Sequence, residues 1–183
     1  MKYFLGSLLI QILTFSSFAQ SSSHPYTPSD QGSSVSFTLK NLGFNTGGSF
    51  TGLQGAIVFD PQNTAASSFD VSVDAASVNT DNNMRDNHLK EDSYFDVKNY
   101  PRIRFVSTGI GPADKSGHFT ITGNLTIKNT TKEISFPFIA TPMGEDYIFK
   151  GTFQLNRKDF GIGGSSTISN NLTVSLTVLA KKS

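Results

Sequence analysis

The segment HFTITGNLTIKNTTKEISFPF, residues 118–138, contains two runs of alternating apolar and polar residues on either side of a short polar turn. In the first run Phe119 and Ile121 alternate with threonines, and in the second Ile134, Phe136 and Phe138 repeat the alternation. Successive side chains of a β-strand point to opposite faces, so a period of two gives each strand one apolar face and one wet face. The segment therefore predicts two antiparallel strands joined by a tight turn.

The same alternation continues in both directions along the chain and predicts an all-β domain of eight strands. The expected strands lie near residues 35–40, 50–59, 68–75, 102–109, 117–127, 132–140, 146–156 and 171–180. Turn-forming residues separate them, at Gly47-Gly48, Asp60-Pro61, Gly111-Pro112, Asn129, Pro142 to Gly144, and Gly161 to Gly164. Short connections favour antiparallel neighbours. Eight one-sided strands can bury their apolar faces in a barrel or in a sandwich, and only a closed barrel removes the exposed edges.

One segment breaks the alternation. Residues 76–101 are charged and polar, with apolar residues at roughly helical spacing. Asp81 to Asn83 can cap a short helix, and Pro101 ends the connection. We expect one or two helical turns here, between the third and fourth predicted strands, covering one end of the domain.

The densest polar cluster of the chain, Arg85, Asp86 and His88, lies in this segment. One interpretation is a polar mouth whose donors meet the head group of a ligand. The other is a structural network of caps and ion pairs that fixes the loop. The second is favoured, because an Asp beside Arg and His is an ordinary way to satisfy polar groups in a loop.

The N-terminus has the features of a targeting segment. Lys2 supplies a positive charge, an apolar run follows, and Ser17-Phe18-Ala19 places small residues where a signal peptidase cleaves. We expect residues 1–19 to be a signal peptide, residues 20–32 to be a flexible lead-in broken by two prolines, and residues 33–183 to form the domain. The mature protein is then exported, periplasmic or secreted, and without a stable membrane anchor.

Composition limits the remaining function classes. Lys2 leaves with the signal peptide, so the mature chain has 14 basic and 14 acidic residues and no net charge. Its electrostatics give no reason to expect a nucleic acid or an anionic membrane surface as a partner. The chain has no cysteine, so neither a disulfide nor a lipid-modified N-terminal cysteine is available.

No pattern of catalytic or metal-binding residues is present in the sequence. His24, His88 and His118 lack ligand spacing, no Gly-x-Ser-x-Gly elbow occurs, and the glycines at 161–164 lack the lysine and helix of a phosphate loop. We expect no enzyme, no metal and no covalent cofactor.

The abundant phenylalanines define the expected interior, because almost all of them fall on the apolar phase of their strands. The predicted lumen comprises Phe37, Leu39, Phe50, Ile57, Phe59, Phe69, Val71, Phe105, Phe119, Ile121, Phe136, Phe138, Phe149, Phe153, Leu155 and Leu176. Eight-stranded barrels are in some cases filled by such side chains and in others hold one small ligand. Periodicity alone leaves both possibilities open.

Several stretches, in this order, are similar to a known family. They are Leu42-Gly43-Phe44 with Gly48 and Phe50, Gly55 to Asp60, Ala76 to Thr80, Arg85 to Leu89, Tyr94 to Val97, Tyr100 to Phe105, Gly123 to Ile127, and Asn156 to Gly161. The chain resembles the YceI-like family of exported, polyisoprenoid-binding proteins over nearly the whole mature length. Asn41 is a departure, because many members carry histidine there.

The resemblance implies a lipocalin-like, eight-stranded antiparallel barrel around an apolar tunnel. It also implies a bound polyisoprenoid or similar amphiphile, such as a quinone with an isoprenoid tail or a fatty-acid-like chain, a possible homodimer, and no catalytic residues. The expected function is thus to hold such a lipid for transport, storage or sequestration. The alternative is a structural or stress-related envelope protein with a filled barrel that acts through its outer surface.

Overall fold

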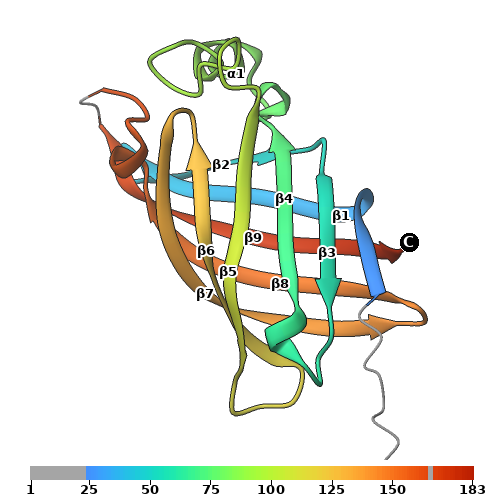
Figure 1. The fold of residues 1–183 in the computed structure, drawn as a ribbon. Helices are drawn as coiled ribbons and strands as arrows, with labels where there is room; N and C mark the ends of the chain where they lie inside the picture. Colours follow the sequence, from blue (N-terminus) through green and yellow to red (C-terminus); the bar gives the residue numbers. More distant parts are fainter. Residues whose placement is uncertain (1–23, 165–166) are drawn as a thin grey trace, which may run out of the picture.

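The structure, a computed structural model, describes residues 24–164 and 167–183 and is a closed antiparallel β-barrel (Figure 1). The strands are β1 (His24–Asn41), β2 (Phe44–Phe50), β3 (Gln54–Phe59), β4 (Ser68–Asp74), β5 (Arg102–Pro112), β6 (His118–Ile127), β7 (Thr130–Met143), β8 (Asp146–Asn156) and β9 (Ile168–Lys182). They pair in the order β2-β1-β3-β4-β5-β6-β7-β8-β9, and an additional β1–β9 pairing closes the barrel. The predicted all-β, lipocalin-like barrel is confirmed.

Nine strands occupy eight positions in the barrel wall. β2 pairs with residues 35–41 of β1, and β3 pairs with residues 24–26 of the same strand, so β2 and β3 follow one another along one edge. The sequence prediction of one strand over residues 50–59 missed this interruption. At the break, Asp30 accepts hydrogen bonds from the backbone N–H groups of Gly52 and Leu53, each at 2.9 Å. Arg102 donates to the Gly52 carbonyl at 2.7 Å.

Two details near the N-terminus correct the sequence prediction. Residues 24–32 of the predicted lead-in belong to β1, where Pro25 lies opposite Val58 and Pro28 lies opposite Ala180. The two prolines predicted the absence of a strand, because proline has no N–H to donate to a β-ladder. The strands that pair with this segment are β3 and the C-terminal β9, and the local sequence does not reveal such distant partners. The predicted signal peptide and residues 20–23 lie outside the described residues.

The first hairpin turns earlier than predicted. Gly47 and Gly48 lie inside β2, opposite Thr38 and Phe37, and the turn is formed by residues 42 and 43, whose φ angles are 50° and 85°. Two successive residues with positive φ are typical of the tight turn that matches the twist of a hairpin. Gly111-Pro112, also predicted as a turn, ends β5.

The 76–101 segment contains the short helix α1 (Asn83–Leu89), as predicted. The Asn82 side chain caps it by accepting a hydrogen bond from the Arg85 N–H at 3.0 Å. In Figure 1, α1 lies beyond one end of β4 and β5. The segment is tied to β2 by a bridge between Asn79 and Ser49, with backbone hydrogen bonds of 2.8 and 3.0 Å. It therefore covers one end of the barrel and completes the wall beside β2.

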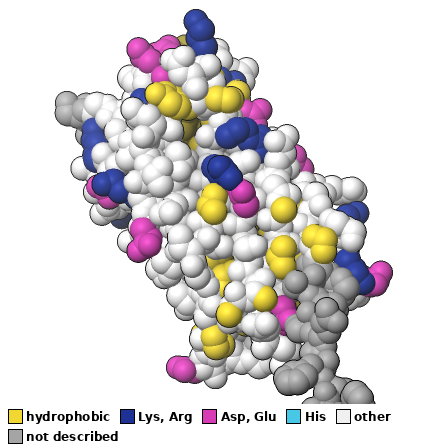
Figure 2. Space-filling view, viewed as in Figure 1, with side chains coloured by type: hydrophobic (Ala, Val, Ile, Leu, Met, Phe, Trp, Pro, Cys, Tyr) yellow, Lys and Arg dark blue, Asp and Glu magenta, His cyan; other side chains and the backbone are white. Residues whose placement is uncertain are grey.

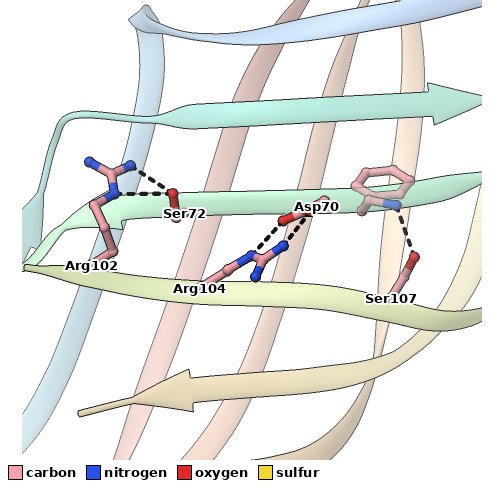
Figure 3. Close-up of polar contacts among 6 residues, drawn as sticks. Asp70, Ser72, Arg102, Arg104 and Ser107 are labelled. Atoms are coloured by element: carbon pink, nitrogen blue, oxygen red, sulfur yellow. Dashed lines mark hydrogen bonds and ion pairs between the residues drawn. The ribbon is translucent and has the colours of Figure 1, made fainter. Parts of the chain in front are cut away.

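The outer faces of β4 and β5 carry polar pairs (Figure 3). Arg104 donates to both carboxylate oxygens of Asp70 at 2.6 and 2.8 Å, and Arg102 donates to the Ser72 hydroxyl. The register between β5 and β6 shifts at Ser107, and the Ser107 hydroxyl accepts a hydrogen bond from the Phe69 N–H at 2.8 Å. Figure 2 shows charges of both signs scattered over this face, without a large area of one sign. Within the described residues no helix is long and apolar enough to cross a membrane.

Candidate ligand cavity

The barrel interior divides into a closed end and an open end. The closed end is packed with aromatic and aliphatic side chains: Tyr26, Ile57, Phe59, Phe69, Phe119, Ile121, Phe138, Ala140, Phe149 and Ala180 are all buried. Phe59 is at its centre, with ring centroids 5.2 Å from those of Phe119, Tyr147 and Phe149 in edge-to-face geometry. Such geometry places the positive edge of one ring on the negative face of another. This half of the barrel is filled.

The open end contains a cavity of about 250 Å³ with an almost entirely apolar wall. Nine of the predicted lumen residues line it: Phe37, Leu39, Phe50, Val71, Phe105, Phe136, Phe153, Leu155 and Leu176. The other seven, Ile57, Phe59, Phe69, Phe119, Ile121, Phe138 and Phe149, lie in the closed end and do not line the cavity. One half of the barrel is thus filled by side chains, and the other half contains a cavity.

Residue accessibility reflects the same division. Most inward side chains of the closed end are buried, Tyr147 being only partly so, whereas Phe37, Phe105, Phe153 and Leu176 are partly buried although they also point inward. An inward apolar side chain that lines the cavity lacks packing partners on its cavity side. These positions therefore mark the wall of the cavity.

Inward-facing glycines give the phenylalanine rings room to lie across the interior. A Cβ at Gly123 would stand 2.5 Å from Cζ of Phe105, and one at Gly48 would stand 2.5 Å from Cζ of Phe37. A Cβ at Gly151 would come within 3.2 Å of the Phe136 ring. The sequence analysis missed this pairing, because the glycines and their rings come from different strands.

Residues outside the predicted strands close the rim. Leu89, Tyr94 and Phe95 from the 76–101 segment line the cavity, as do Phe160 and Ile162 from the connection between β8 and β9. Phe95, Phe160 and Ile162 form a second buried cluster with Val78, Leu125 and Ile127. Alternation could not identify the loop members of this cluster, since alternation selects inward residues only within strands.

Arg157 holds the second rim loop in place and was also missed. It belongs to the 3₁₀ turn Arg157–Phe160, is buried, and lines the cavity. Its guanidinium donates to the carbonyl oxygens of Ile162 at 2.7 Å, Ser169 at 3.0 Å and Ile168 at 3.2 Å. A planar guanidinium with five donors is suited to bind several carbonyl groups in one loop. The position of Phe160 and Ile162 over the cavity depends on this anchor.

The predicted polar mouth residues occupy three different environments. Arg85 lines the cavity and donates to the Thr80 hydroxyl at 2.7 Å and to the Thr80 carbonyl at 2.6 Å. Asp86 is buried and accepts from the Thr80 N–H at 2.9 Å and from the Thr80 hydroxyl. His88 is exposed, pairs with Glu91 at 3.1 Å and does not line the cavity. Asp86 thus fixes the loop, as the favoured interpretation has it, and Arg85 alone of the three reaches the cavity.

A second, polar recess adjoins the first cavity. Asn45 to Ser49 of β2 and Asn79, Thr80, Asp81 and Arg85 line it, and Thr46, Thr80 and Arg85 line both spaces. Asn41 lines the apolar cavity as well, and its side-chain oxygen accepts a hydrogen bond from the Thr167 hydroxyl at 3.3 Å. An apolar chamber bordered by hydrogen-bonding groups is complementary to an amphiphile, whose apolar chain matches the chamber and whose polar head group matches its border.

Candidate metal ligands do not gather in this part of the molecule. Over residues 24–164 and 167–183, no group of three or more His, Cys, Asp or Glu side chains could hold a metal ion.

Comparison with known proteins gives matches that agree in sequence and in fold. A model of the YceI-like domain matches residues 26–180. A UPF0312 protein of Vibrio cholerae is 34% identical over 152 residues, with 77% of this chain and 79% of the relative covered.

Two solved structures share the barrel. BcnA of Burkholderia cenocepacia superposes with a TM-score of 0.79 at 26% identity, covering 84% of this chain and 99% of BcnA. A polyisoprenoid binding domain from Saccharophagus degradans superposes with a TM-score of 0.69, covering 86% of this chain and 98% of that domain. Its 14% identity establishes a common fold and nothing further.

Proposed function

The chain belongs to the YceI-like family, and on that premise we propose that it binds the apolar chain of an isoprenoid or similar amphiphile in the open half of its barrel. The observation that carries the proposal is the cavity of about 250 Å³ with its almost wholly apolar wall. Exposure of an apolar lipid chain to water costs a free energy of roughly 0.8 kcal/mol for each CH₂ group. Binding in an apolar cavity removes that cost without directional contacts.

The polar recess supports an amphiphile rather than a pure hydrocarbon. Thr46, Thr80 and Arg85 border both spaces, so a head group that stays in the recess keeps its hydrogen bonds while the chain enters the cavity. The fold neighbour from Saccharophagus degradans, named a polyisoprenoid binding domain, is consistent with this class of ligand.

The proposed role is binding and not catalysis. Most of the groups around the cavity are phenyl and aliphatic side chains, and Arg85 and Arg157 donate to backbone carbonyls. The predicted N-terminal signal peptide supports a location in the periplasm or outside the cell, where a binding protein would transport, store or sequester the lipid.

The test is native mass spectrometry of the protein produced with its own N-terminal segment, followed by extraction and identification of any bound lipid. We expect a chain that begins at Gln20 and carries one amphiphile per barrel. Replacement of Val174, which lines the cavity, by arginine should abolish the adduct, because a charge in an apolar chamber opposes an apolar chain.

Ser175 provides the matched control, because it is the next residue of β9 and is exposed. Ser175→Arg should keep the adduct. A mass without adduct that stays unchanged after incubation with polyprenyl lipids, isoprenoid quinones and fatty acids would reject the proposal. It would favour the alternative of a barrel that acts through its outer surface.

A further inference from the structure

Three phenylalanine rings separate the cavity from the closed end. Phe105, Phe136 and Phe153 all line the cavity, and all three also pack into the aromatic cluster of the closed end. The rings of Phe136 and Phe153 are stacked, with centroids 4.4 Å apart and an interplanar angle of 22°, and the centroid of Phe105 lies 5.8 Å from that of Phe136. Together they form a layer across the interior, here called the Phe floor.

The Phe floor is held in place from the side. Gly123 and Gly151 leave the space that the rings of Phe105 and Phe136 occupy. Gly123 also approaches the Val106 carbonyl so closely that a Cβ would stand 2.5 Å from its oxygen. Since this second neighbour is a backbone atom, a side chain at position 123 could not be accommodated by moving the Phe105 ring alone.

The cavity does not reach the rings that pack beyond the Phe floor, because Phe69, Phe138 and Phe149 do not line it. Phe138, Phe149 and Phe69 lie there, are buried, and contact one another with ring centroids 5.1 to 6.1 Å apart. Such packed interiors respond as a unit, so a chain cannot enter without displacing large side chains. The cavity is therefore blind at this end.

The depth of the cavity follows from the strands that line it. From Val35 to Asn41 the wall along β1 is roughly 20 Å long at ~3.3 Å per residue. An extended chain advances about 1.2 Å per backbone bond. Barrel strands tilt by about 35–45° from the barrel axis, so this wall spans a depth of about 15 Å. The chamber thus covers on the order of 12 chain bonds, and the remainder of any longer chain stays outside the wall.

We propose that the Phe floor, formed by Phe105, Phe136 and Phe153, sets the length of apolar chain that the protein accepts. This inference rests on the proposed lipid-binding function and adds a specificity-determining layer to it. The preferred ligand class is an amphiphile whose single chain ends at the Phe floor.

The experiment is a length series of straight-chain fatty acids from C8 to C24, below their micelle concentrations, with dissociation constants measured by displacement of a fluorescent probe. For the native protein, affinity should rise about fourfold with each added CH₂ group and level off near about twelve chain carbons. Added carbons beyond that length gain no apolar wall.

Three variants locate the limit. Phe136→Ala should move the levelling point to longer chains, and Leu176→Phe, which adds a ring beside the Phe floor, should move it to shorter ones. Ser175→Phe adds a ring to the exposed face of the same strand as Leu176 and leaves the cavity unchanged, so its levelling point should equal that of the native protein. Leu176→Phe keeps the test decisive if Phe136→Ala does not fold.

The outcomes distinguish the length limit set by the Phe floor from the lipid-binding function on which it rests. Binding that strengthens steadily through C24, or levelling points that coincide in the native protein, Phe136→Ala and Leu176→Phe, would overturn the Phe floor and leave lipid binding standing. Failure of the native protein to bind any member of the series or any polyprenyl lipid would reject the proposed function itself.

Discussion

Gly123 shows how a missing side chain shapes the interior. It faces inward on β6, and a Cβ there would meet the ring of Phe105 and the Val106 carbonyl, each at 2.5 Å. We expect Gly123→Ala to lower the free energy of unfolding by about 1–3 kcal/mol, the usual range for overpacking a core. Urea denaturation measures the change.

Gly109 is the matched control for this substitution. It lies on the neighbouring strand β5, and a Cβ there would have no atom within 4 Å. Gly109→Ala should leave stability unchanged or slightly raised, because alanine loses less backbone entropy than glycine on folding. Equal free energies of unfolding of the two variants would show that the interior rearranges around an alanine at position 123 without a measurable cost.

Asp70 and Arg104 predict a pH dependence on the outer face. The hydrogen bonds and charge of Arg104 lower the pKa of the Asp70 carboxyl below its ordinary value. A lowered folded-state pKa stabilises the protein above the ordinary Asp pKa, and this contribution disappears as pH falls through the folded-state pKa.

The stability difference between the native protein and Asp70→Asn should therefore be small at neutral pH, because both partners are half exposed, and should shrink towards zero in acid. Denaturant titrations across this pH range measure it. A difference that grows in acid would show that other groups control this region.

At the level of the element, the 76–101 segment depends on one buried carboxylate. Asp86 accepts two hydrogen bonds from Thr80, whose hydroxyl also accepts from Arg85. Asp86→Ala leaves these donors without their acceptor, at a cost of about 1–3 kcal/mol. Amide exchange in residues 78–95 should quicken, because the segment loses its anchor.

Asp92→Ala is the comparison for this change, since Asp92 is an exposed aspartate of the same segment. It should leave amide exchange at native rates. If Asp86→Ala also exchanged at native rates, the apolar contacts of Phe95 would suffice to hold the segment.

The sequence predicted elements well where a single strand carries the signal. Alternation gave the inward phase of the strands that it predicted, including that of Phe59, Phe136 and Phe149, and the Asp81 to Asn83 region gave the start of α1. It failed where structure depends on distant partners. Residues 24–32 belong to β1 because β3 and β9 pair with this strand. At the break between β2 and β3, the backbone groups of Gly52 find hydrogen-bond partners in Asp30 and Arg102.

The candidate site was predicted less completely for the same reason. Periodicity assigned all inward residues to one lumen, but which half is hollow depends on how rings from several strands meet. The rim residues Phe95, Phe160 and Ile162 come from loops, and their inward direction is fixed by anchors such as Arg157.

At the level of the whole molecule, the proposed lipid binding predicts that ligand and stability are coupled. A ligand that binds only the folded barrel stabilises it by about 2.7 kcal/mol when its free concentration is 100 times its Kd. For a domain of this size that amounts to a rise in Tm of roughly 5–10 °C. We expect organic extraction to lower the Tm of the purified protein and added lipid to restore it in scanning calorimetry.

The Val174→Arg variant tests whether the shift arises in the cavity. Its Tm should not respond to extraction or to added lipid, whereas that of Ser175→Arg should respond like the native protein. A lipid-dependent shift in the Val174→Arg protein would place the binding site elsewhere on the molecule.

The two-part interior has a consequence for how such a protein can evolve. The closed end, with its buried cluster around Phe59, supplies packing that does not depend on the cargo. Substitutions at positions of the open end such as Val174 alter a wall that borders a void. Under the proposed function, such changes would alter which apolar chain the barrel accepts, while the packing of the closed end preserves the fold.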